Sequence, residues 1–136
     1  MGESNIHMDL VRLLRRYVIN SNKISCKLIL SDLPEEIEKP IAMPEGFRPD
    51  LYYKDSHCLI IGEAKTSLDF KKKHSINQYM SYLKYCSIYS SNSKFYLAVP
   101  WDVFISAKNL LRKIKKQNNY LFEIYVLNDI NCVEKI

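Results

Sequence analysis

The strongest constraint on the fold is an alternation of strand-like and helix-like segments in the second part of the chain. Apolar, strand-like stretches cover residues 57–65, 95–99 and 121–127. Between them, residues 71–89 and about 103–114 carry apolar side chains at every third or fourth position, as in amphipathic helices. An alternation of this kind is typical of an α/β fold, in which helices cover a sheet.

The first part of the chain adds a helix and two further strands. Residues 4–19 have helical apolar spacing, and residues 24–30 and 47–53 alternate as half-buried strands do. Residues 54–56 have turn composition, so the strands on either side of them are expected to pair as a hairpin. The element order is then αβββαβαβ. It predicts an α/β domain over residues 1–136, with a mixed central β-sheet flanked by helices.

One segment has no periodic pattern. Residues 32–46 contain three prolines and four glutamates, and we expect a long loop there. A loop of this length inside a compact domain is usually functional or mobile.

Composition limits the cellular setting and the classes of partner. The formal net charge of +5 permits a polyanionic partner without requiring one. No apolar run approaches the ~20 residues that cross a bilayer, and the N-terminus lacks a basic segment followed by an apolar one. A cytoplasmic protein that does not enter a membrane is therefore expected. The four cysteines show no metal-ligand spacing, and we expect reduced, mostly buried thiols.

Three charged residues on the expected hairpin form the first candidate site. Asp50 lies on one strand, and Glu63 and Lys65 lie two residues apart on the other, where their side chains leave the same face. Two carboxylates beside an ammonium group suit Mg²⁺ or Mn²⁺, and the lysine could position water or stabilise charge on a phosphoryl group. Glu63 also follows an apolar run, where unpaired charges are rare.

The alternative for these three residues is an ordinary solvated strand face. An acidic-x-Lys triplet is common, and Asp69-Phe70-Lys71 is a second example in this chain. That second triplet follows no apolar run and has no proline-aspartate pair upstream at hairpin distance.

The helix over residues 71–89 carries a polar and aromatic edge. Gln78 and Tyr82 are four residues apart and therefore adjacent on one helix face, and Tyr85 and Tyr89 extend the same line. Such tyrosines often lie at the rim of a core. The functional interpretation is that Gln78 and Tyr82 border the acidic site and contact substrate or orient Lys65. The apolar stripe is formed by Ile76, Met80, Leu83 and Ser87, with Tyr79 and Cys86 flanking it.

Together, the segments Arg48-Pro49-Asp50, Gly62-Glu63-Ala64-Lys65-Thr66 and Gln78-x-x-x-Tyr82 resemble the PD-(D/E)XK nuclease superfamily. The likeness extends to its VRR-Nuc, Holliday junction resolvase and RecB-like members. It implies a restriction-endonuclease-like αβββαβ core. It also implies the catalytic residues Asp50, Glu63, Lys65, Gln78 and Tyr82, and metal ligation by Asp50, Glu63 and the Ala64 carbonyl.

In several of these nucleases an acidic residue of the first helix joins the metal site. Glu3 matches this pattern because it falls on the apolar side of the predicted helix. Asp9 is the competing candidate, on the less favourable side of the same helix.

The activity implied by the resemblance is a Mg²⁺- or Mn²⁺-dependent DNA nuclease that hydrolyses phosphodiester bonds. The chain has no visible module for reading bases, so the nuclease should recognise DNA structure. The expected substrate is double-stranded DNA, branched DNA or DNA with free ends. A homodimer would match a two-fold symmetric substrate, and a larger DNA-processing or restriction complex could supply specificity.

The alternative function is a catalytically inactive nuclease-fold module that binds nucleic acid or protein. Several basic side chains could contact phosphates in either case, although a solvated face is the other explanation for each cluster. These side chains are Arg12, Arg16, Arg48, Lys71, Lys72 and Lys73.

Overall fold

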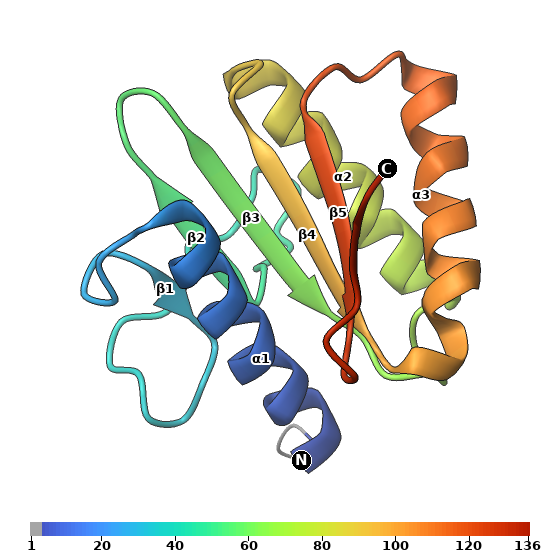
Figure 1. Cartoon of the computed structure of the whole chain (residues 1–136). Helices are drawn as coiled ribbons and strands as arrows, with labels where there is room; N and C mark the ends of the chain where they lie inside the picture. The colour runs from blue at the N-terminus through green and yellow to red at the C-terminus, as the bar shows by residue number, and fades with distance from the viewer. Residues whose placement is uncertain (1–3) are drawn as a thin grey trace.

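A six-stranded sheet runs through the molecule, with one helix on one face and two on the other (Figure 1). The structure is a computed structural model, and it describes residues 4–136. The helices are α1 (Asn5–Asn22), α2 (Lys73–Tyr89) and α3 (Phe104–Asn118), with a short 3₁₀ turn η1 (Trp101–Val103) before α3. The strands are β1 (Leu30–Ser31), β2 (Leu51–Lys54), β3 (Leu59–Ala64), β4 (Lys94–Val99), β5 (Glu123–Asn128) and β6 (Val133–Lys135).

The strands lie side by side in chain order. β2 pairs antiparallel with both β1 and β3, which confirms the predicted hairpin between β2 and β3. β4 runs parallel to β3 and to β5, and β6 returns antiparallel along β5. The α/β class and the mixed sheet flanked by helices are therefore confirmed. None of the described helices has the length and hydropathy that a membrane span requires.

β3 is buried on both faces because α1 covers one face of the sheet and α2 and α3 cover the other. Successive side chains of a strand point to opposite faces. Leu59 and Ile61 therefore pack with α2 and α3, whereas Ile60 packs with α1. Gly62 also faces α1, where a Cβ atom would lie 2.9 Å from Leu14 Cδ2. The missing side chain at Gly62 thus lets α1 approach the sheet closely.

The strand predicted over residues 24–30 is wrong for most of its length. α1 ends at Lys23, whose left-handed backbone (φ 54°) turns the chain, and the Leu28 N–H then donates to the Ser25 carbonyl in a tight turn. Cys26 and Leu28 are exposed, so their alternation with polar residues did not reflect a buried strand face. The following segment, residues 32–46, contains neither helix nor strand, as predicted.

The predicted apolar stripe of α2 is right for Leu83, which is buried, and for Ile76, which packs against the core, and wrong for its other two residues. Met80 and Ser87 are exposed, whereas the buried face consists of Ser75, Gln78, Tyr79, Ser81, Tyr82, Leu83 and Cys86. Tyrosines can enter this core when their hydroxyl groups find partners, and the Tyr79 hydroxyl donates to the Phe70 carbonyl at 2.8 Å.

The prediction of mostly buried thiols is wrong as well. Only Cys86 of the four cysteines is buried. Cys26 and Cys132 are exposed because both lie in surface turns, and Cys58 is half-buried at the start of the β3 region.

Candidate active site at the carboxyl end of β3

Asp50 and Glu63 meet where β2 begins and β3 ends. The antiparallel register pairs Leu51 with Gly62, which sets Asp50 opposite Glu63. The Asp50 N–H donates to Glu63 Oε1 at 3.2 Å, and the Ala64 N–H donates to Asp50 Oδ2 at 2.9 Å. Both side chains are buried. The hairpin backbone therefore fixes the two carboxylates relative to one another.

Lys65 and Gln78 complete the polar cluster from the other side. Lys65 Nζ lies 3.2 Å from Glu63 Oε2, and the Lys65 side chain is only 13% exposed. The same ammonium group donates to Gln78 Oε1, which reaches it from the first half of α2. Gln78 thus contacts Lys65, which corresponds to the orienting role considered from the sequence.

Tyr82 lies one turn further along α2, with its ring beside Phe95. Its hydroxyl oxygen is buried and makes no hydrogen bond to any residue in the described part of the chain. Burial raises the pKa of Tyr82 strongly, and the Glu63 and Asp50 carboxylates raise it further. The hydroxyl is therefore a protonated group close to the acidic pair and is available to donate.

His7 also belongs to this cluster, although the sequence analysis gave it no role. Its Nε2 atom lies 3.2 Å from Asp50 Oδ2, and its side chain is 13% exposed. The signal that could have found it is helical spacing, because His7 shares one face of α1 with the buried residues Val11, Leu14 and Val18. That face carries His7 onto the sheet.

The two acidic residues considered near the first helix have different positions. Glu3 lies outside the described residues. Asp9 is directed into solvent, with its side chain 77% exposed, and its carboxylate pairs with Arg12 Nη1 at 3.4 Å.

The cluster carries an electrostatic cost that a cation would relieve. Burial, with the Asp50 carboxylate as neighbour, raises the pKa of Glu63 well above its ordinary value, and Lys65 opposes this only in part. The Ala64 carbonyl leaves β3 on the same edge as the Ala64 N–H, which binds Asp50. Two carboxylates and a carbonyl on one edge are the hard oxygen donors that Mg²⁺ and Mn²⁺ accept.

This donor set fits a cation that also binds substrate. No group of three or more His, Cys, Asp or Glu side chains within residues 4–136 is arranged to hold a metal ion. Mg²⁺ commonly takes one or two carboxylates and completes its shell with water and substrate phosphate oxygens. Asp50 and Glu63 match that type of site better than a cage made entirely of protein groups.

Three of the six basic residues proposed to contact phosphates are already paired with acidic side chains. Arg12 makes two hydrogen bonds to the Glu35 carboxylate, at 2.8 and 3.0 Å, which lower the pKa of Glu35 to about 2. Arg48 lies 3.8 Å from Asp32, and Lys72 lies 2.7 Å from Asp69. The other three side chains, Arg16, Lys71 and Lys73, are exposed.

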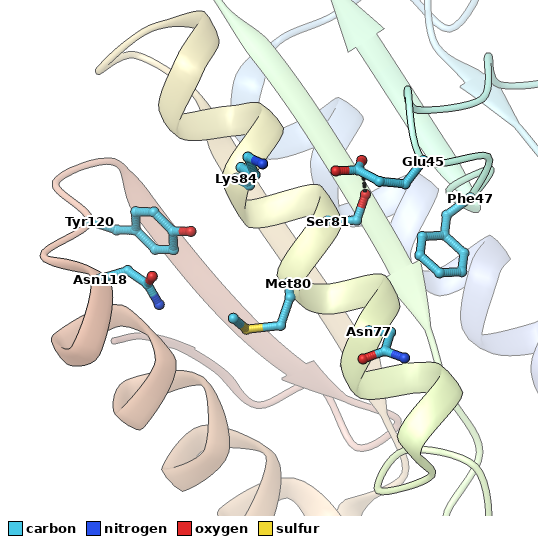
Figure 2. A pocket seen from close by; sticks show the side chains of 8 residues that line it. All are labelled: Glu45, Phe47, Asn77, Met80, Ser81, Lys84, Asn118 and Tyr120. Carbon is cyan, nitrogen blue, oxygen red and sulfur yellow. Dashed lines mark hydrogen bonds between the residues drawn. The ribbon is translucent and has the colours of Figure 1, made fainter.

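A separate hollow of about 450 Å³ lies over the outer face of α2. Figure 2 shows Met80 at its centre, Glu45 and Phe47 on one side, and Asn118 and Tyr120 on the other. Its lining includes none of the polar cluster around Asp50. The candidate site is therefore recognised by its buried charges rather than by a cavity.

Replacing Glu63 with Gln is expected to stabilise the fold at pH 8 in EDTA. Because the pKa of Glu63 is higher in the folded than in the unfolded chain, ionising it above its ordinary pKa of 4.5 costs stability as pH rises. The variant should therefore be more stable than wild type at pH 8 and lose this gain below about pH 4, as measured by urea unfolding.

Glu35 provides a control in which the pKa shift has the opposite sign. Its pKa is lowered by Arg12, so Glu35→Gln should be neutral or destabilising at pH 8. If the Glu63→Gln variant showed the same stability difference from wild type at both pH values, the electrostatic account of this cluster would be wrong.

Comparisons of the chain with protein-family models, curated proteins and solved structures find no match. The resemblance to PD-(D/E)XK nucleases therefore rests on the motif residues and on the contacts that they make with one another.

Proposed function

We propose that this chain is a metal-dependent DNA nuclease of the PD-(D/E)XK type with a restriction-endonuclease-like core. The observation that carries the proposal is the meeting of Asp50, Glu63 and Lys65 in one buried, hydrogen-bonded cluster. The order of elements from α1 to β4, with an antiparallel β2–β3 hairpin and a parallel β4, supports the same assignment.

The proposed roles follow from the position of each group. Asp50, Glu63 and the Ala64 carbonyl would hold Mg²⁺ or Mn²⁺. When bound, such an ion lowers the pKa of water and stabilises negative charge on a phosphate. Lys65 can donate to a phosphate oxygen and stabilise the charge that develops there. Gln78 positions the Lys65 ammonium group, and the Tyr82 hydroxyl is a further donor beside the acidic pair.

The burial of these charges favours a functional explanation. A buried ion pair is often no more stabilising than apolar residues of similar volume, and two carboxylates together are worse. Glu63 therefore weakens the fold at neutral pH. A residue that costs stability at the end of a core strand is typical of a catalytic or ligand-binding group.

One observation favours the second candidate, a catalytically inactive module. Three of the four acidic oxygens are engaged within the protein: Asp50 Oδ2 by His7 and Ala64, and the two Glu63 oxygens by Asp50 and Lys65. A module with such a satisfied network would bind DNA without a cation and cleave nothing.

The test is an assay of the purified protein on linear, circular, single-stranded and branched DNA. We expect cleavage with Mg²⁺ or Mn²⁺, no cleavage in EDTA, and binding without cleavage when Ca²⁺ replaces Mg²⁺. DNA binding in every buffer with cleavage in none would favour the inactive module. Neither binding nor cleavage of any of these forms would overturn the nuclease and the DNA-binding module, and would leave an inactive module that binds protein.

A further inference from the structure

Exposed apolar side chains gather at the same end of the sheet as Asp50 and Glu63. β3 and β4 are parallel and pair Ala64 with Ala98, so the segments that follow them leave the sheet next to each other. Trp101 directly follows β4 and is 63% exposed. Figure 1 shows the start of α1 and the segments after β3, β4 and β5 at this one end. The other exposed apolar residues in these segments are Ile6, Leu68, Ile105 and Ile130.

The backbone of Trp101 is held firmly although its side chain is exposed. The Trp101 N–H donates to Asp129 Oδ1 at 2.9 Å, which ties η1 to the turn after β5. The Ser67 hydroxyl donates to Asp102 Oδ1 at 2.8 Å, which ties η1 to the segment that begins at Lys65. An exposed aromatic side chain on an anchored backbone, at the end of the sheet where the Lys65 N–H donates to the Ala98 carbonyl, is a feature of binding surfaces.

The surrounding charges indicate what can approach Trp101. Asp102 and Asp129 flank the residue and repel phosphate groups, whereas a nucleobase is neutral and stacks on an aromatic ring. Lys71 and Lys73 are exposed on the segment that follows Ser67, where they can meet phosphates. A phosphate backbone is therefore favoured on the lysine side and a base ring on the tryptophan side.

We propose that Trp101 stacks on an unpaired base of DNA bound at the candidate site. A continuous duplex keeps its bases stacked inside and presents phosphates, so no base face is free to stack on the Trp101 ring. The substrate class is then DNA with an unpaired nucleotide at the scissile region, such as a single-stranded extension, a flap or an open junction. This inference rests on the proposed function, because it takes DNA to be the ligand.

The experiment uses the fact that Trp101 is the only tryptophan in the chain. Its fluorescence is recorded in Ca²⁺ while a DNA hairpin closed by a non-nucleotide linker is added, either with a short single-stranded extension or with a blunt end. We expect quenching by the extended hairpin and little by the blunt one. Trp101→Ala should weaken binding of the extended hairpin by on the order of tenfold, with blunt-end affinity unchanged.

Two variants sharpen the comparison, which uses anisotropy of labelled DNA. Trp101→Phe keeps an aromatic ring and should retain most of the affinity for the extended hairpin. Ile88→Ala removes an equally exposed apolar side chain from the last turn of α2, and it should change neither affinity.

Equal losses for both hairpins, or no quenching by either, would overturn the stacking proposal. A second overturning result is a change of oligomeric state in Trp101→Ala, seen by sedimentation, with unchanged affinity for the extended hairpin. In that case the apolar surface would join two copies of the chain. Because binding is measured without cleavage, selective quenching together with an absence of cleavage in Mg²⁺ would refute the nuclease assignment alone.

Discussion

Replacing Asp50 with Asn, or Lys65 with Met, is expected to lower the rate of DNA cleavage by on the order of 100-fold or more. The first change removes a carboxylate that the Ala64 N–H holds in place, and the second removes the ammonium group beside Glu63. Both substitutions keep the approximate shape of the side chain. The measurement is the single-turnover rate on labelled DNA in Mg²⁺, with the melting temperature recorded to verify folding.

The second acidic-x-Lys triplet of the chain supplies the matched control. Asp69 pairs with Lys72, and Lys71 is exposed, so neither belongs to the buried cluster. Asp69→Asn, and Lys113→Met at an exposed lysine of α3 outside the proposed phosphate contacts, should leave the cleavage rate within a few-fold of wild type. If the two sets of variants lost activity equally, the reaction would not be centred on Asp50.

Replacing Gly62 with Ala is expected to destabilise the fold by roughly 1–3 kcal/mol. The new Cβ atom would meet Leu14 Cδ2 at 2.9 Å and Leu51 Cβ at 3.1 Å, so the Leu14 side chain or α1 itself must shift within the packed core. Leu14→Ala alone should cost roughly 2–5 kcal/mol, because Leu14 is fully buried. The double variant should cost less than the sum of the two, since Leu14→Ala removes the closest contact. Urea unfolding of all four proteins measures this coupling.

Gly46 gives the control for backbone strain without crowding. Its φ is +94°, and a Cβ atom there would meet nothing within 4 Å. Gly46→Ala should cost about 1 kcal/mol through its backbone conformation. Its effect should add to that of Leu14→Ala, because the two sites share no contact. If Gly62→Ala were equally additive with Leu14→Ala, the close approach of α1 would not explain its cost.

The sequence predicts the fold best where a segment is buried on both sides. β3, β4 and β5 are central strands with apolar runs, and the two helices between them show clear periodicity, so their type and order were predicted correctly. Residues 24–30 misled because three alternating apolar residues also suit a tight turn. β6 was missed because Val133-Glu134-Lys135 is short and lies at the sheet edge, where pairing with β5 rather than composition makes it a strand.

The candidate site, like the fold, could be predicted from the sequence only in part. A hairpin fixes which residues face each other, so the proximity of Asp50 and Glu63 could be inferred from the turn at residues 54–56. Helical spacing places His7 on the buried face of α1, but its contact with Asp50 could not be predicted because it depends on how α1 docks on the sheet. Likewise, the pairing of Arg12 with Glu35 could not be foreseen, because residues 32–46 lack a regular pattern that would fix their path.

The spread of the polar cluster along the chain has a consequence for synthesis and folding. Its bonds join His7 to Asp50, Asp50 to Glu63, and Lys65 to Gln78, and so they draw on α1, β2, β3 and α2. A chain emerging from the ribosome cannot close this network until Gln78 has been made and α2 has docked. Until then the charged groups remain hydrated, and the cost of dehydrating them arises when α1, the β2–β3 hairpin and α2 come together. A nascent or partly unfolded chain therefore carries these side chains without assembling them, and any activity they support begins only with the finished fold.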